Sequence, residues 1–175
     1  MIKLISFKQI IIPAIMGCLT VLYGCSYRFS GTGELPSGMM RIFVSVIENN
    51  TAEAGIENFL TDDVINEFIL RKKDVLSRQE DADGVLTGSI EYIRDMPIAH
   101  SSQSKSTQRR VFLGVTLNLT DTKGKTVWAV NGINANQAYK VTDDKTQTDQ
   151  NKKEAIQVLS KRLAEKIYNR LTDDF

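Results

Sequence analysis

Apolar and polar positions alternate most regularly in the second half of the chain. Between residues 111 and 119 every odd position is Val or Leu, and these positions form one wholly apolar face. A period of two predicts a strand. The residues of Asp121–Gly124 favour a tight turn, after which Thr126–Tyr139, with Trp128 and an Asn-rich middle, is predicted to return as a strand with an exposed or edge portion.

The first half predicts a strand followed by a helix. Arg41–Ile47 is rich in β-branched residues and nearly apolar on both faces, which is typical of a strand inside a mixed sheet. Apolar residues then recur at helical spacing up to the basic run Arg71–Lys73, which suits a helix C-terminus. These apolar positions are Ile56, Leu60, Val64, Ile65, Phe68 and Ile69.

One strand, two loops and a closing helix complete the expected elements. Val85–Ile93 predicts a strand with Leu86, Ile90 and Tyr92 on one side, whereas the polar stretches Pro97–Thr107 and Val141–Thr148 are predicted to be loops. A closing amphipathic helix is predicted from apolar positions with Lys and Arg on its other face. Those positions are Ile156, Leu159, Leu163, Ile167 and Leu171.

The predicted order is therefore βαβββα. A strand, a helix and another strand in succession favour a right-handed crossover between parallel strands. The fold class expected for residues 41–175 is α/β in the broad sense, an α+β two-layer sandwich. It would have a four-stranded mixed sheet with both helices on one face.

The N-terminus has the pattern of a bacterial export signal. Lys3 and Lys8 precede the mostly apolar run Ile10–Leu22, which is shorter than the ~20 residues that a membrane-spanning helix needs. The junction Leu22–Cys25 resembles a lipobox, in which the cysteine is acylated and becomes the new N-terminus. Residues 1–24 are thus expected to be a lipoprotein signal peptide, Cys25 the lipidation site, and residues 25–40 a tether able to reach ~50 Å.

Two other interpretations of this segment compete. Ile15–Cys18 is also lipobox-like, but cleavage there leaves only about five strongly apolar residues after Lys8, fewer than a signal core needs. An uncleaved transmembrane helix is disfavoured by Pro13 inside an already short apolar run. Within the tether, Tyr27 and Phe29 could pack on the domain or lie at the membrane interface.

Composition narrows the function classes. The chain has 22 basic and 21 acidic residues, and loss of Lys3 and Lys8 with the signal leaves a formal charge near −1, so bulk charge offers no argument for nucleic-acid binding. Both cysteines lie in the signal, so the exported domain must be held by its apolar core without disulfides.

No catalytic or cofactor site is predicted. His100, the only histidine, lies in a Ser-rich stretch and is interpreted as a solvated residue. Asp81–Gly84 lacks the further oxygen ligands of a calcium loop and is interpreted as a turn before a strand. Because Gly-rich phosphate loops, nucleophile elbows and metal motifs are missing from the sequence, we expect no enzyme activity, cofactor or metal.

Taken together, these segments resemble one family, the lipopolysaccharide-assembly lipoproteins LptE. The similarity runs over essentially all of Cys25–Phe175. The residues that carry it are Cys25 with its lipobox, Tyr27, Phe29, Leu35–Pro36, Glu48–Thr51, Gly55–Glu57, Thr61, Phe68 and Asp81–Ile90.

The resemblance implies a lipid-anchored protein on the periplasmic side of the outer membrane, without enzyme activity. It would plug the β-barrel LptD, assist the barrel's assembly and take part in transport of lipopolysaccharide to the cell surface. One alternative is a similar lipoprotein that activates a cell-envelope enzyme or serves another polysaccharide-export machine. A free-standing lipid carrier is a third, but it would need a sizeable apolar pocket.

Geometry suggests where lipopolysaccharide would bind. If the last three strands form a meander, the loop Pro97–Thr107 and the end of the last strand lie at the same edge of the sheet. Five cations would gather there and could bind phosphate groups, with arginine offering paired donors. The five are Lys105, Arg109, Arg110, Lys140 and Lys145. An ordinary solvated rim is the alternative, since Asp143 and Asp144 would partly neutralise them.

Overall fold

The computed structural model describes residues 35–100 and 106–173, which lie within the second of two units of the chain, Gly31–Phe175. The predicted signal, Cys25 and the first part of the tether lie outside the described residues. The strands are β1 (Ile42–Val44), β2 (Glu48–Asn49), β3 (Gly84–His100), β4 (Ser106–Asp121) and β5 (Thr126–Lys140). The helices are α2 (Ile56–Lys72) and α3 (Lys145–Asp173), with short 3-10 turns η2 (Pro36–Gly38), η3 (Lys73–Val75) and η4 (Gln79–Asp81).

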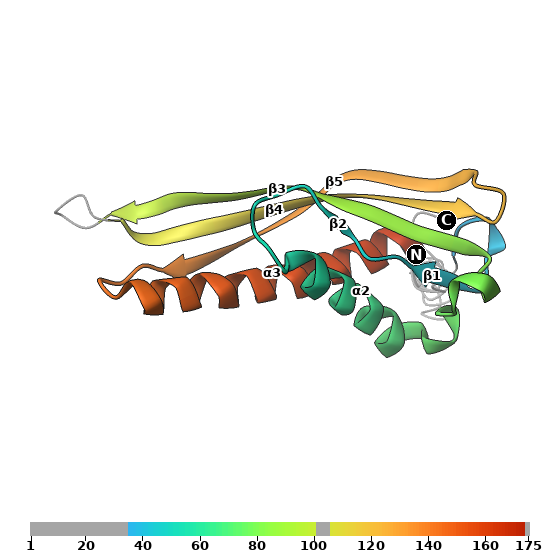
Figure 1. Cartoon of the computed structure of the whole chain (residues 1–175), viewed down its shortest axis with the longest axis horizontal. Coiled ribbons are helices and arrows are strands. Elements are labelled where there is room, and N and C mark those ends of the chain that lie inside the picture. Colours follow the sequence, from blue (N-terminus) through green and yellow to red (C-terminus); the bar gives the residue numbers. More distant parts are fainter. Residues whose placement is uncertain (1–34, 101–105, 174–175) are drawn as a thin grey trace, which may run out of the picture. The chain divides into compact units, whose positions relative to one another are not determined.

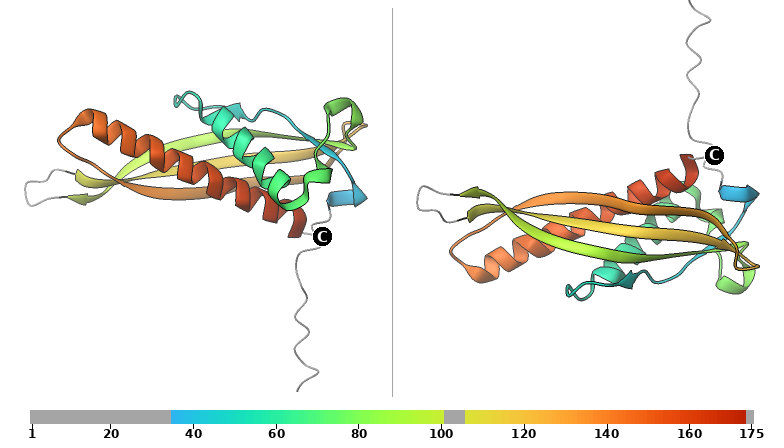
Figure 2. Two further views of the ribbon diagram at one scale, coloured as in Figure 1. Left: turned by 90° about the horizontal axis from the view of Figure 1, so that it is seen from below. Right: turned by 90° about the horizontal axis from the view of Figure 1, so that it is seen from above.

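The strands form one mixed sheet in the order β1-β3-β4-β5, with β2 also paired to β3. β1 and β2 run parallel to β3, whereas β3, β4 and β5 form an antiparallel meander. Both helices cover the same face of this sheet (Figures 1 and 2). The predicted two-layer α+β fold is confirmed, and β2 adds a short fifth strand to the four expected.

The core lies between the helices and the apolar face of β4. Leu113, Leu117 and Leu119 are fully buried, as the alternation predicted. The apolar helix positions that face them are also buried. From α2 these are Ile56, Leu60, Val64 and Phe68, and from α3 they are Ile156, Leu159, Leu163, Ile167 and Leu171.

The first predicted strand is shorter than expected and lies at the edge of the sheet. Arg41–Ile47 was predicted to be one strand inside the sheet, but pairing breaks after Val44 and resumes in β2. The free side of β1 is closed by the chain after α2, where Ser77 N donates to Ile42 O (3.0 Å). Ile42 is therefore completely buried although its strand is an outer one.

Polar residues that carry the family resemblance build the junction between β2 and α2. Asn49 donates through Nδ2 to Glu57 Oε2 and to Glu53 O (both 2.8 Å), and its Oδ1 accepts from Thr51 N (2.9 Å). Thr61 accepts from Ile47 N (3.0 Å) through Oγ1, which ties the helix back to the preceding chain. This set of bonds orients α2 against the sheet, so these residues have a structural role.

Both ends of the predicted loop Pro97–Thr107 are strand, which corrects that prediction for these residues. Pro97–His100 continue β3 and Ser106–Thr107 begin β4, and Pro97 pairs with Arg109. Met96 and Ile98 are 52% and 41% exposed. Because this part of the hairpin has no apolar face to bury, its polar composition hides a strand whose backbone groups are satisfied by cross-strand pairing.

Tyr92 lies on the face opposite to the one predicted. The register shifts between Ile90 and Tyr92, so Ile90 pairs with Val115 whereas Tyr92 pairs with Gly114. This bulge at Glu91 turns Tyr92 to the open face, because an extra residue reverses the alternation of side chains. Leu86 and Ile90 remain in the core, as predicted.

The last helix begins inside the predicted loop Val141–Thr148, because Lys145–Thr148 are already helical, and this corrects the loop prediction. Asp144 caps the helix, since Oδ1 accepts from Thr146 N (2.8 Å), and α3 therefore starts at Lys145.

The turn Asp121–Gly124 is confirmed: Asp121 Oδ1 accepts from Lys123 N (2.9 Å), and Gly124 has a φ of 76°.

Candidate functional site

The predicted cationic site lies at one end of the domain. The β3–β4 hairpin end, the end of β5 and the first turns of α3 gather there, whereas η2, the β4–β5 turn and the end of α3 lie at the other end (Figure 1). Gln108 pairs with Lys140, and Arg110 pairs with Ala138. The predicted meander thus brings the start of β4 and the end of β5 together.

Arg109 lies on the helix-covered face, where it is already paired. Its Nε donates to Asp95 Oδ1 and its Nη2 to Asp95 O (both 3.0 Å). Tyr139 donates from its hydroxyl to Asp95 Oδ2 (2.6 Å). Burial, and then the bond to Asp95, raise the pKa of Tyr139 to about 12, and the same carboxylate raises the pKa of Arg109. Arg109 therefore has a structural role.

Arg110 and Lys140 share the open face of the sheet. Arg110 is opposite Ala138, two residues from Lys140, so the two cations are diagonal cross-strand neighbours. Such neighbours lie within reach of each other when their side chains are long. Nε of Arg110 is buried and has no hydrogen-bond partner among the described residues.

The remaining two predicted cations do not join them. Lys145, at the start of α3, donates to Asp149 Oδ2 (2.6 Å), which raises its pKa. Lys105 lies outside the described residues. The structure thus brings Arg110 and Lys140 together on one face, whereas Arg109 and Lys145 each pair with a carboxylate elsewhere.

Sequence reasoning missed an aromatic and cationic cluster on the open face. The guanidinium of Arg94 lies over the Tyr92 ring, 4.6 Å from its centre, and the ring covers Gly114. A side chain at position 114 would collide with that ring. Gly114 inside a strand of bulky residues was the available signal, because such a glycine often marks a close approach.

The described residues contain no group of three or more His, Cys, Asp or Glu side chains that could hold a metal. Asp83, considered for calcium, instead accepts from Met40 N (3.0 Å) and Arg41 N (2.9 Å). These two bonds lower its pKa and attach the start of β1 to the start of β3. Among the helices in the described part of the chain, none has the length and apolar character needed to cross a membrane.

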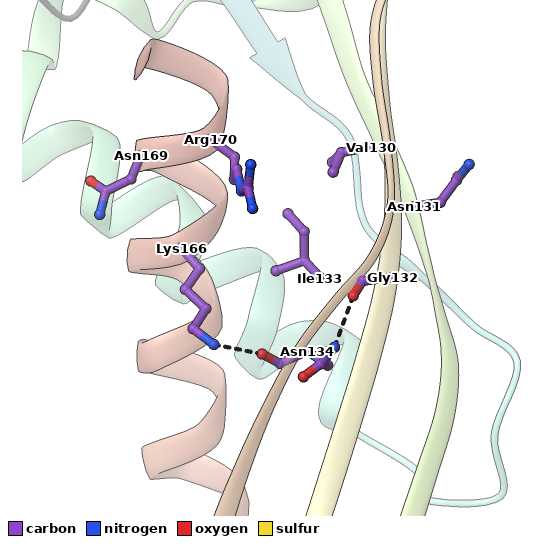
Figure 3. Close-up of a pocket in the computed structure, with 8 residues that line it drawn as sticks. All are labelled: Val130, Asn131, Gly132, Ile133, Asn134, Lys166, Asn169 and Arg170. Atoms are coloured by element: carbon purple, nitrogen blue, oxygen red, sulfur yellow. Dashed lines mark hydrogen bonds between the residues drawn. The ribbon is translucent and has the colours of Figure 1, made fainter. Parts of the chain in front are cut away.

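A groove lies between β5 and the C-terminal half of α3 (Figure 3). Its volume is about 470 Å³, and Val130, Ile133, Lys166 and Arg170 are among the residues that line it. β5 bulges here, since Val130 and Ile133 pair with Leu117 and Val115 and leave two residues opposite one. No sequence prediction concerned this groove.

Comparison with known proteins identifies the family. A family model named LptE and described as lipopolysaccharide-assembly matches residues 39–171. No curated protein matches the chain.

Solved structures of lipoproteins share the fold. Lipoprotein B from Nitrosomonas europaea is 11% identical with a TM-score of 0.56, and the match covers 80% of this chain and 85% of that one. The rare lipoprotein B from Shewanella oneidensis is 12% identical with a TM-score of 0.53, covering 73% and 92%. A lipoprotein from Caulobacter crescentus is 16% identical with a TM-score of 0.53, covering 73% and 88%. At these identities the likeness concerns the fold alone.

Proposed function

The chain belongs to the LptE family of lipopolysaccharide-assembly lipoproteins, which are not enzymes, and on this basis we propose that it works at the outer membrane with the barrel LptD. There it plugs the barrel, assists its assembly and takes part in moving lipopolysaccharide to the cell surface. The observation that carries the proposal is the family match, which spans β1 to α3.

Affinity purification of the lipidated protein from membranes tests the partner. A large outer-membrane barrel should be the main protein that remains bound after detergent washes. Recovery of a cell-envelope enzyme, or of a different polysaccharide-export protein, in place of that barrel would favour the alternative role and refute this one.

The proposed anchor is an acylated Cys25, which would hold the protein on the periplasmic side of the outer membrane. Several acyl chains bind a bilayer firmly, since each buried methylene contributes ~0.8 kcal/mol. Cys25→Ala should release the domain or stop its processing, whereas Cys18→Ala should have neither effect. An unmodified mature N-terminus in mass spectrometry, or a mature chain starting at Cys18, would refute the assignment.

Lipopolysaccharide contact is proposed for the open-face pair Arg110 and Lys140. Two adjacent cations suit phosphate oxygens, and an arginine can offer them paired donors. Replacing both with serine should weaken lipopolysaccharide binding at low salt and leave barrel association intact. The matched control removes two positive charges as well, but at the other end of the domain.

That control is Lys123→Ser with Lys125→Ser, two exposed positions in the β4–β5 turn. Binding by the control should equal that of the parent. If the Arg110 and Lys140 double variant also equals the parent across salt concentrations, lipopolysaccharide contacts another surface.

A further inference from the structure

Three cations on α3 face strand β5 at intervals of one helical turn. Arg162 donates through Nη1 to Asn136 O (2.8 Å), and Lys166 donates through Nζ to Asn134 O (2.7 Å). Arg170 is the third. Four residues of a helix rise by ~6 Å, and two residues of a strand span ~6.8 Å. Every fourth residue of α3 can therefore reach every second carbonyl of β5.

By this match the acceptor for Arg170 would be the carbonyl of Gly132. That carbonyl instead accepts from Asn134 Nδ2 (3.0 Å), and Gly132, with a φ of 72°, forms part of the bulge (Figure 3). No hydrogen bond or ion pair joins Arg170 to any residue whose side chain the structure describes, a part of the chain that ends at Thr172. The bulge therefore separates the third cation from the backbone that the first two bind.

The groove around Arg170 is cationic. Lys166 is its neighbour one turn earlier, so the two like charges repel each other. None of the described residues that line the groove is acidic, while Val130 and Ile133 provide apolar surface. Lys166 is held in place by Asn134 O and has further N–H donors to offer.

We propose that this groove binds a phosphate ester, with Arg170 and Lys166 contacting the phosphate and Val130 and Ile133 contacting the organic group. Two cations complement a dianionic phosphate better than a single carboxylate. The volume of about 470 Å³ exceeds what a free phosphate needs and lies within the ~300–1,000 Å³ of small-molecule sites. The β5 residues of this site, Val130–Asn134, lie near the middle of the strand and six or more residues from Lys140, so the site stands independently of the proposed lipopolysaccharide contact.

Isothermal titration calorimetry of the full chain in detergent micelles at low salt, with glucose 1-phosphate as the probe, tests the proposal. The parent should bind, and Arg170→Gln should weaken binding about tenfold, as expected when a charge-assisted hydrogen bond is lost. Lys161→Gln removes the same charge from another exposed position on α3 and should change affinity by less than about twofold. Unchanged melting temperatures would show that both variants are folded.

Ligand comparisons identify the chemical class. Glucuronate and inorganic phosphate should both bind more weakly than glucose 1-phosphate, because the first offers one negative charge and the second has no organic group. Equal binding of either one, no binding by the parent, or unchanged binding by Arg170→Gln would overturn the proposal. If the Arg110 and Lys140 double variant loses binding and Arg170→Gln does not, the ligand binds at the β3–β4 hairpin end and the groove proposal is refuted.

Discussion

The same substitution should have different effects on stability at two consecutive arginines, Arg109 and Arg110. Arg109→Ser removes two hydrogen bonds to Asp95 and leaves that carboxylate, 26% exposed, with Tyr139 as its remaining side-chain partner. Bonds between charged groups contribute ~1.5–3 kcal/mol when buried. Because the Arg109 side chain is 34% exposed and water replaces part of the interaction, the expected loss is ~1–2 kcal/mol of unfolding free energy.

Arg110→Ser should change stability by less than ~0.5 kcal/mol, because Arg110 Nε has no partner among the described residues and the substitution therefore breaks no hydrogen bond of this atom. Urea unfolding followed by circular dichroism measures both, and equal slopes would show that only stability differs. The reasoning also predicts that lipopolysaccharide binding falls in Arg110→Ser. Equal midpoints for the two variants, or a larger loss for Arg110→Ser, would mean that the two faces are assigned wrongly.

Three further predictions concern the sheet. Leu117→Ala should cost ~2–5 kcal/mol of unfolding free energy because Leu117 is fully buried, whereas Asn118→Ala on the open face should cost much less; similar melting temperatures would contradict this. Gly114→Ala places a Cβ 2.3 Å from a ring carbon of Tyr92 and should cost ~1–3 kcal/mol, part of which Tyr92→Ala should recover in the double variant. The raised pKa of Tyr139, about 12, means that the folded state retains this proton longer than the unfolded one. Stability should therefore fall as the pH rises from about 10 to 12, by at most ~1.4 kcal/mol per pH unit from this group, and Tyr139→Phe should lessen the decline.

Periodicity predicted the elements that pack against the core. The strand of Val111–Leu119 and the two helices have apolar faces, so burial and sequence pattern coincide there. Polar segments were predicted less well. Pro97–His100 and Ser106–Thr107 extend the strands by pairing with each other's strand, and sequence composition does not reveal such pairing.

The candidate sites depend on single-residue irregularities. One extra residue at Glu91 turns Tyr92 to the open face, and the bulge at Gly132 leaves Arg170 without a carbonyl to bind. Successive side chains of a strand point to opposite faces of the sheet. Arg109 and Arg110, which are neighbours in the sequence, therefore lie on opposite faces of β4, and the predicted cluster of cations is divided. The strand meander brought the charges to one end of the sheet, but it was the alternation along each strand that determined their face.

Depletion of the protein in the bacterium that encodes it tests the central claim most directly. The measurement is the fraction of LptD that forms a folded, heat-modifiable barrel, followed together with lipopolysaccharide at the cell surface. The proposed function predicts that both fall on depletion and recover when the parent chain is restored. A fully folded LptD barrel and normal surface lipopolysaccharide in depleted cells would contradict it.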